Sequence, residues 1–189
     1  FHVWFPGGVV IGGLAAFGLD FIGLTAWQLK IGLILVPTVA YGIMLLREPF
    51  PDTEGVKAGV SMGEMFRCAF TTPLMWVMLV AMAMTASVEL GPNRWVPAVL
   101  EAGGIPGILV LVWINGLMAV MRYRAGTVVH RLSPTGLLVA SALVSGAGLF
   151  ALSYVSSPLT IFGAATVFAV GVCYFWPTML GVVSERVPR

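Results

Sequence analysis

The chain has 189 residues, of which 59% are hydrophobic and only 10% are charged, and its formal net charge is +2. A soluble domain carries roughly a quarter charged residues, so this composition excludes a water-soluble fold and predicts an all-α membrane protein with several spans. The positive charge is too small and too scattered to indicate a nucleic-acid partner. The lipid bilayer is therefore the expected main partner, and no obligate protein partner is evident.

Two apolar segments open the chain, at residues 2–19 and 29–46. In the first, Gly8, Gly12 and Ala16 repeat at four-residue spacing, which predicts a smooth helix face for close contact with a second helix. Pro37 lies in the middle of the second segment and is predicted to kink it, because proline removes a backbone hydrogen bond.

Residues 47–72 form the only long polar stretch, and we interpret it as a linker between two membrane bundles. Within this stretch, residues 61–70 place four large apolar side chains on one side of a predicted short helix: Met62, Met65, Phe66 and Phe70. An amphipathic helix of this kind is expected to lie on the membrane surface.

The third apolar segment, residues 73–100, contains the feature on which the functional prediction depends. An uncharged run over 73–87 is followed by Glu89 and then by Gly91 and Pro92, which we expect to break the helix. An ionisable group beside a break in a membrane span is expensive unless it faces protein or a water-filled cavity. Interrupted helices form the sites of many secondary transporters near the bilayer midplane.

Segments 108–123, 136–154 and 159–183 complete six predicted spans. Small residues run through the fifth and predict tight helix packing. Eight basic residues then fall on one side of the membrane, and only Lys30 and Arg94 on the other: Arg47, Lys57, Arg67, Arg122, Arg124, Arg131, Arg186 and Arg189. The positive-inside rule places the linker 47–72 and the loop 122–135 in the cytoplasm of a multi-pass protein of the plasma (bacterial inner) membrane.

The two cysteines and the histidines do not indicate a metal or cofactor site. Cys68 and Cys173 are far apart in the chain, with no other cysteine or histidine at metal-ligand spacing. We therefore expect both to be small apolar fillers, and we predict no disulfide, metal or cofactor.

At the basic loop the chain resembles the major facilitator superfamily of transporters. The superfamily carries a Gly-x-x-x-Asp-Arg-x-Gly pattern in its loop between helices eight and nine. Gly126 and Arg131 match this pattern, whereas His130 and Ser133 replace the aspartate and the second glycine. The residues around Arg122 and Arg131, and the spacing of Glu89 and Trp95, are similar to the fucose–galactose–glucose:proton symporter branch.

The resemblance implies a six-helix fragment, about helices five to ten, of a twelve-helix fold built from two bundles of six. Residues 1–46 would be the last two helices of the N-terminal bundle, 47–72 the cytoplasmic linker, and 73–189 the first four helices of the C-terminal bundle. The implied mechanism is alternating access, in which the two bundles rock around a central site. The first and fourth spans would then face the opposite bundle.

Glu89 is the candidate for proton coupling, because burial disfavours the charged form of a carboxylate. The alternative is that Glu89 lies near the outer interface, pairs with Arg94 and only fixes the helix break. Six residues are candidates to contact a solute in the cavity, although each has a structural alternative as a helix-packing or interface residue: Thr85, Asn93, Trp95, Asn115, Thr166 and Tyr174. Arg122 and Arg131, with Gly126 and His130 of the same motif, are candidates for a cytoplasmic gate or for topology determinants.

Three functions remain open. The first is proton-coupled symport of a sugar or another small polar solute. The second is export of drugs or metabolites within the same superfamily, which Met78, Met82 and Met84 favour as the lining of an apolar cavity. The third is a non-transporting membrane protein such as a sensor. We do not expect an enzyme, because the sequence contains no catalytic constellation and no phosphate-binding glycine loop.

Overall fold

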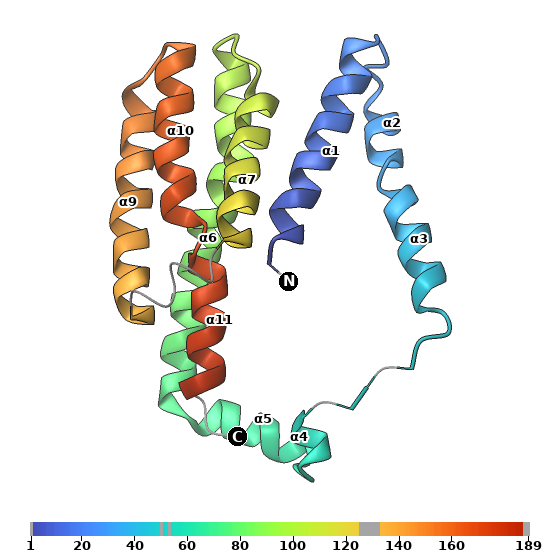
Figure 1. Ribbon diagram of the computed structural model, residues 1–189, viewed down its shortest axis with the longest axis vertical. Helices are drawn as coiled ribbons and strands as arrows, with labels where there is room; N and C mark the ends of the chain where they lie inside the picture. Colours follow the sequence, from blue (N-terminus) through green and yellow to red (C-terminus); the bar gives the residue numbers. More distant parts are fainter. Residues whose placement is uncertain (1, 50, 53, 125–132, 187–189) are drawn as a thin grey trace.

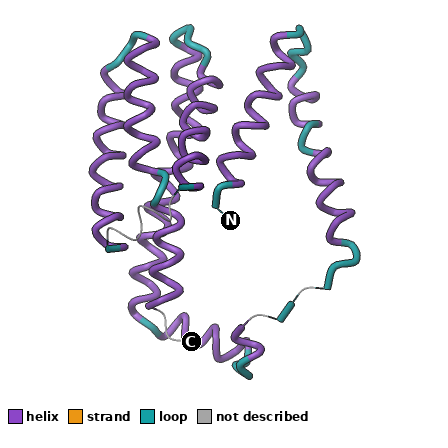
Figure 2. The backbone as a smooth tube through the Cα atoms, in the orientation of Figure 1, coloured by secondary structure: helices purple, strands orange, loops and turns teal. Residues whose placement is uncertain are grey.

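The computed structural model describes residues 2–49, 51–52, 54–124 and 133–186, and within these residues every regular element is a helix. Figures 1 and 2 show long helices running alternately up and down, with short turns at the top joining successive helices. The all-α prediction is confirmed. The helices are α1 (Trp4–Phe21), α2 (Trp27–Gly32), α3 (Leu35–Leu45), α4 (Glu54–Lys57), α5 (Met62–Thr71), α6 (Pro73–Ala102), α7 (Gly107–Tyr123), α9 (Pro134–Tyr154), α10 (Pro158–Val172) and α11 (Phe175–Arg186).

Five helical segments are long and apolar enough to cross a membrane: Trp4–Phe21, Trp27–Leu45, Pro73–Ala102, Pro134–Tyr154 and Pro158–Val183. The fourth predicted span corresponds to α7, an apolar helix of only 17 residues. At about 1.5 Å per residue, α7 is about 26 Å long, a little less than the ~30 Å hydrocarbon core of a bilayer. The chain therefore has the architecture of a multi-pass membrane protein, with one span shorter than the others.

Prolines accompany interruptions in two of the predicted spans, whereas the break that we predicted in the third span is absent. The helix around Pro37 is interrupted between α2 and α3, which confirms the predicted kink. The last span is interrupted in the same way between α10 and α11, four residues before Pro177. The break predicted at Gly91 and Pro92 is wrong, because α6 continues through Pro92 and Pro97 for 30 residues. Each proline removes one backbone bond, and the rest of the helix remains the best way to satisfy backbone groups within a membrane.

The most extensive helix packing joins α9 to α10, as the small residues of the fifth predicted span indicated. A Cβ atom on Gly148 would collide with the backbone of Phe168, and a Cβ atom on Gly171 would collide with the backbone of Ser145. The hydrophobic core lies beside this contact, where side chains of α7 and α10 are almost fully buried: Val110, Ile114, Met118, Ile161, Phe168 and Val172. The tight packing prediction is confirmed.

Helix α1 packs on α7, but through a different face from the one that we predicted. A Cβ atom on Gly13 would lie 2.8 Å from Cγ2 of Val112 in α7. Gly8 and Gly12 of the predicted stripe are exposed and have open space around them. The glycine spacing therefore predicted a close contact in the correct helix and assigned it to the wrong face.

Helices α2 and α3 lie at the outside of this arrangement (Figure 1), and none of their residues is buried. The Lys30 ammonium lies 2.6 Å from Oδ1 of Asp20, an ion pair that ties α2 to the end of α1. These two helices present apolar side chains outward along their whole length.

The linker contains the predicted short amphipathic helix, α5, which runs across the end of α6 in Figure 1. Ser61 and Glu64 form a reciprocal capping box at its N-terminus. The backbone N–H and the hydroxyl of Ser61 both donate to the Glu64 carboxylate and hold its pKa below the ordinary value. Met62, Phe66 and Phe70 are exposed, as expected for a helix whose apolar side meets a membrane surface.

Candidate functional site

Glu89 lies in the middle of the longest helix. It follows Pro73 by 16 residues and precedes Ala102 by 13, so it stands about 24 Å and about 20 Å from the two ends of α6 at the usual helical rise. The residue is only 5% exposed. The carboxylate is thus covered by protein midway along an apolar helix long enough to cross a membrane, and burial of this kind is what the sequence argument required.

The partner of Glu89 is Arg122, the penultimate residue of α7. Nη2 of Arg122 donates to Oε1 of Glu89 over 2.9 Å, and the two side chains are 2% and 6% exposed, respectively. The alternative pairing of Glu89 with Arg94 is wrong, because Arg94 is exposed and Glu89 bonds Arg122 instead. Charges removed from water this completely are retained only with close partners and additional hydrogen bonds.

The guanidinium of Arg122 also binds two backbone carbonyls from other parts of the chain. Its Nε donates to the carbonyl of Cys173 over 2.7 Å, and its Nη1 donates to the carbonyl of His2 over 3.4 Å. Arg122 therefore joins α7 to α6, to the junction of α10 with α11, and to the chain just before α1. The rigid fork of an arginine side chain suits this arrangement of three acceptors.

The carbonyl of Cys173 is available because of Pro177. In an uninterrupted helix this carbonyl would accept the N–H of the residue four positions later, and that residue is Pro177, which has no N–H. A carbonyl left free inside a membrane bundle needs another donor. Arg122 supplies that donor, so the interruption between α10 and α11 helps to hold the arginine in place.

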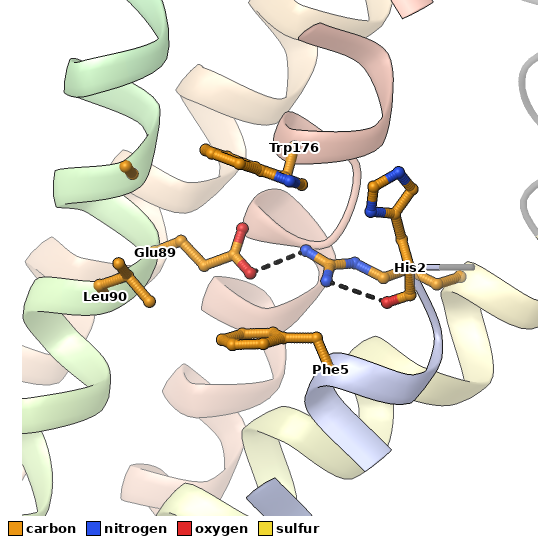
Figure 3. A pocket seen from close by; sticks show the side chains of 7 residues that line it. His2, Phe5, Glu89, Leu90 and Trp176 are labelled. Carbon is orange, nitrogen blue, oxygen red and sulfur yellow. Dashed lines mark hydrogen bonds and ion pairs between the residues drawn. The ribbon is translucent and has the colours of Figure 1, made fainter. Parts of the chain in front are cut away.

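A cavity of about 230 Å³ lies beside the ion pair and is lined by seven residues: His2, Phe5, Ala86, Glu89, Leu90, Arg122 and Trp176. Figure 3 shows the rings of Phe5 and Trp176 on opposite sides of the ion pair, with the His2 imidazole beyond Arg122. Oε2 of Glu89, the oxygen that does not face Arg122, is buried and has no hydrogen-bond partner. The cavity thus combines aromatic walls with a carboxylate that retains an unused acceptor.

The His2 side chain is the third polar side chain of the cavity wall, beside Glu89 and Arg122. Burial, followed by the nearby charge of Arg122, lowers the pKa of the imidazole below its ordinary value. His2 received no functional prediction from the sequence. Among the described residues, no group of three or more His, Cys, Asp and Glu side chains is placed to hold a metal ion.

Two of the predicted solute-contacting residues bond each other instead of lining this cavity. Nδ2 of Asn115 donates to Oδ1 of Asn93 over 3.2 Å and to the carbonyl of Leu111 over 2.9 Å. Asn115 is fully buried, so the amide pair joins α6 to α7 one turn from Glu89. This arrangement matches the alternative that we gave for Asn115, in which a buried amide holds helices together.

The other predicted contacts lie at separate places in the fold. The hydroxyl of Thr85 donates to the carbonyl of Met82 over 2.9 Å, and Trp95 is 70% exposed on the outside of α6. Thr166 accepts a bond of 2.9 Å from Nε1 of Trp113. Tyr174 is buried at the junction between α10 and α11. None of these four residues lines the cavity beside Glu89.

The motif residues have a mixed outcome. Arg122 was predicted to lie at a gate or in a basic loop, whereas the structure buries it at the end of α7 against Glu89. Gly126, His130 and Arg131 lie outside the described residues. Because Arg122 is buried and does not lie in a loop, it does not count toward the eight basic residues that predicted the orientation. The side of the membrane on which the loops lie stays a prediction.

Of the parts of this site that the sequence reasoning missed, one had a signal in the sequence. Pro177 marks a carbonyl that needs a donor, which could have led from Cys173 to the search for a buried arginine. Phe5 and Trp176 carry no comparable signal, because aromatic residues in membrane helices are common at interfaces and in packing contacts.

No protein-family model, no curated protein and no solved structure matches the chain. The resemblance to the major facilitator superfamily therefore remains a hypothesis that depends on the residues quoted for it.

Proposed function

We propose that this chain belongs to a secondary active transporter that works by alternating access and couples protons to the uptake of a sugar or another small polar solute. In this proposal the helices correspond to about helices five to ten of a major-facilitator fold. The observation that carries the proposal is the buried ion pair between Glu89 and Arg122 beside a cavity in the middle of the bundle.

A buried ion pair is an expensive way to hold two helices together. Removing each charge from water costs several kcal/mol, and an apolar pair of similar size is often as stabilising. Ionisable residues inside membrane spans therefore tend to mark ion or substrate pathways. The Glu89–Arg122 pair fits this pattern better than a purely structural role, because one carboxylate oxygen is left without a partner.

Protonation of Glu89 supplies a switch between two states. In the charged state, Oε1 accepts from Arg122 and ties α6 to α7. A proton on the carboxylate removes the opposite charge and weakens its bond to Arg122, which keeps its two carbonyl acceptors, Cys173 and His2. The link through Arg122 between α6 and the chain just before α1 is then weakened. In this proposal α1 and α6 belong to different bundles, so the two states differ at the contact between the bundles, as alternating access requires.

Proteoliposomes containing a pH-sensitive dye test the proposal with a panel of monosaccharides and other small polar solutes. We expect at least one solute to drive protons into the lumen and to accumulate when the outside is acidic. Glu89→Gln should abolish this proton movement and leave solute exchange across the membrane. Glu101→Gln is the matched control, since Glu101 is exposed at the end of the same helix. Proton movement in Glu89→Gln equal to that in the control would refute the coupling role.

Export of apolar molecules is the second candidate, and the apolar walls contributed by Phe5, Leu90 and Trp176 favour it. The methionines that suggested it do not support it, because Met78, Met82 and Met84 do not line this cavity. If protons entering from an acidic outside drive solute out of the lumen, instead of causing it to accumulate there, the result would favour export. Proton binding without solute movement in either direction would favour a sensor.

A further inference from the structure

We infer that the cavity beside Glu89 is a binding site for a flat, uncharged molecule of about one ring that carries a hydrogen-bond donor. The inference narrows the solute of the proposed function from a sugar or another small polar molecule to the second of these, because a sugar ring is not flat. Only the transport of that solute rests on the proposed function. It is argued from the size of the cavity, the charge of its wall, its aromatic sides and the unused acceptor.

The size of the cavity sets the upper limit on the ligand. Its volume is about 230 Å³, whereas an engineered apolar cavity of about 150 Å³ in another protein already holds benzene. Pockets for drug-sized ligands are larger, at roughly 300–1,000 Å³. The cavity therefore has room for one substituted ring and is too small for a disaccharide or a multi-ring molecule.

The charge of the wall excludes an ionic ligand. The Glu89 carboxylate and the Arg122 guanidinium lie 2.9 Å apart and compensate each other. A bound cation or anion would be an additional, uncompensated charge in a buried site, which costs far more than a neutral molecule of the same shape. The ligand should therefore be uncharged.

Phe5 and Trp176 both line the cavity and flank the ion pair that lies between them (Figure 3), so each offers an aromatic wall to a ring-shaped ligand. Aromatic rings contact a planar ligand over a large area and add stacking energy. Oε2 of Glu89 is at the same time a buried acceptor without a partner. An unpaired charged acceptor is costly, so a ligand with a hydroxyl or N–H donor gains more than an equally flat ligand without one.

Four molecules that share one benzene ring test these requirements: benzyl alcohol, toluene, benzylammonium and benzoate. Binding to the purified full chain in lipid nanodiscs is measured by saturation-transfer NMR, with empty nanodiscs subtracted to remove partitioning into lipid. We expect benzyl alcohol to bind most tightly and the other three to bind at least about tenfold more weakly, as the loss of a bond to a charged group implies. Equal binding of toluene, or tighter binding of benzylammonium or benzoate, would overturn the inference.

A pair of substitutions in α6 places the binding in this cavity. Ala86 lines the cavity, whereas Ala83, almost one turn earlier in the same helix, is exposed. Ala86→Leu fills part of the cavity while keeping both members of the ion pair, and it should abolish benzyl alcohol binding. Ala83→Leu should bind like the unmodified chain. If both variants bind equally, the molecule sits elsewhere and the site assignment fails.

The binding and transport measurements fail independently. If benzyl alcohol binding is lost in Ala86→Leu and no solute shows proton-coupled uptake, the binding site is supported and the proposed function is refuted. If proton-coupled uptake is unchanged in Ala86→Leu, the proposed function is supported and the assignment of the solute to this cavity is refuted.

Discussion

Removing one member of the Glu89–Arg122 pair should destabilise the fold much more than removing both. Arg122→Met leaves a buried carboxylate without its counter-charge, and Glu89→Leu leaves a buried guanidinium; each should cost about 3–5 kcal/mol of unfolding free energy. Independent effects would then sum to about 6–10 kcal/mol in the double variant. Because the double variant leaves no uncompensated charge, we expect it to lose no more than either single variant.

The structure explains why the double variant should still lose some stability. Arg122 also donates to the carbonyls of Cys173 and His2, and methionine cannot replace these bonds. A typical bond to a charged donor contributes about 1.5–3 kcal/mol, and the 3.4 Å bond to His2 should contribute the smaller part. The double variant should therefore fall between the unmodified chain and the single variants.

Reversible unfolding titrations in mixed detergent micelles measure these free energies for all four proteins of the cycle. Arg94→Met and Glu101→Leu form a control cycle, because both residues are exposed on the same helix and should give small, additive changes. If the double variant of Glu89 and Arg122 lost the sum of the two single losses, the two side chains would not be energetically coupled, and the switch built on their pairing would be rejected.

Two further predictions follow from the helix contacts. Pro177→Ala restores an N–H that competes with Arg122 for the carbonyl of Cys173. Proton-coupled uptake should therefore fall about tenfold, and its pH profile should shift without loss of thermal stability. Pro37→Ala, the control, should leave uptake unchanged, and an identical response of the two variants would contradict the role of Pro177. Gly148→Val should cost about 1–3 kcal/mol or more, because its side chain meets the backbone of α10. Gly146→Val, which points into open space, should be nearly neutral in the same unfolding titration.

The helical spans could be predicted from the sequence because hydrocarbon leaves the backbone few choices. Runs of apolar residues long enough to cross a bilayer must form helices when they lie within it. The same constraint explains the wrong break at Gly91 and Pro92. In water this pair would favour ending the helix, but within the membrane α6 continues through it, since ending there would leave several more backbone groups without partners.

The faces on which the helices meet could not be predicted as well. In α1, Gly8 and Gly12 fit a small-residue stripe, yet the contact with α7 is made at Gly13. In a membrane helix both the lipid-facing and the protein-facing sides are apolar, so hydropathy does not distinguish them. Only the partner helix decides, and the position of that partner depends on the whole bundle.

The burial of Arg122 shows how the length of one helix can turn a topological signal into part of a site. An arginine at the end of an apolar run normally marks the membrane surface. Helix α7 has only 17 residues, however, and it packs antiparallel to α6, which has 30. The two helices meet at a short turn, where α6 ends and α7 begins. Counted from this turn, α7 ends partway along α6, opposite Glu89. A longer α7 would carry the same arginine beyond the reach of that carboxylate, so the missing length of α7 is what allows the ion pair to form.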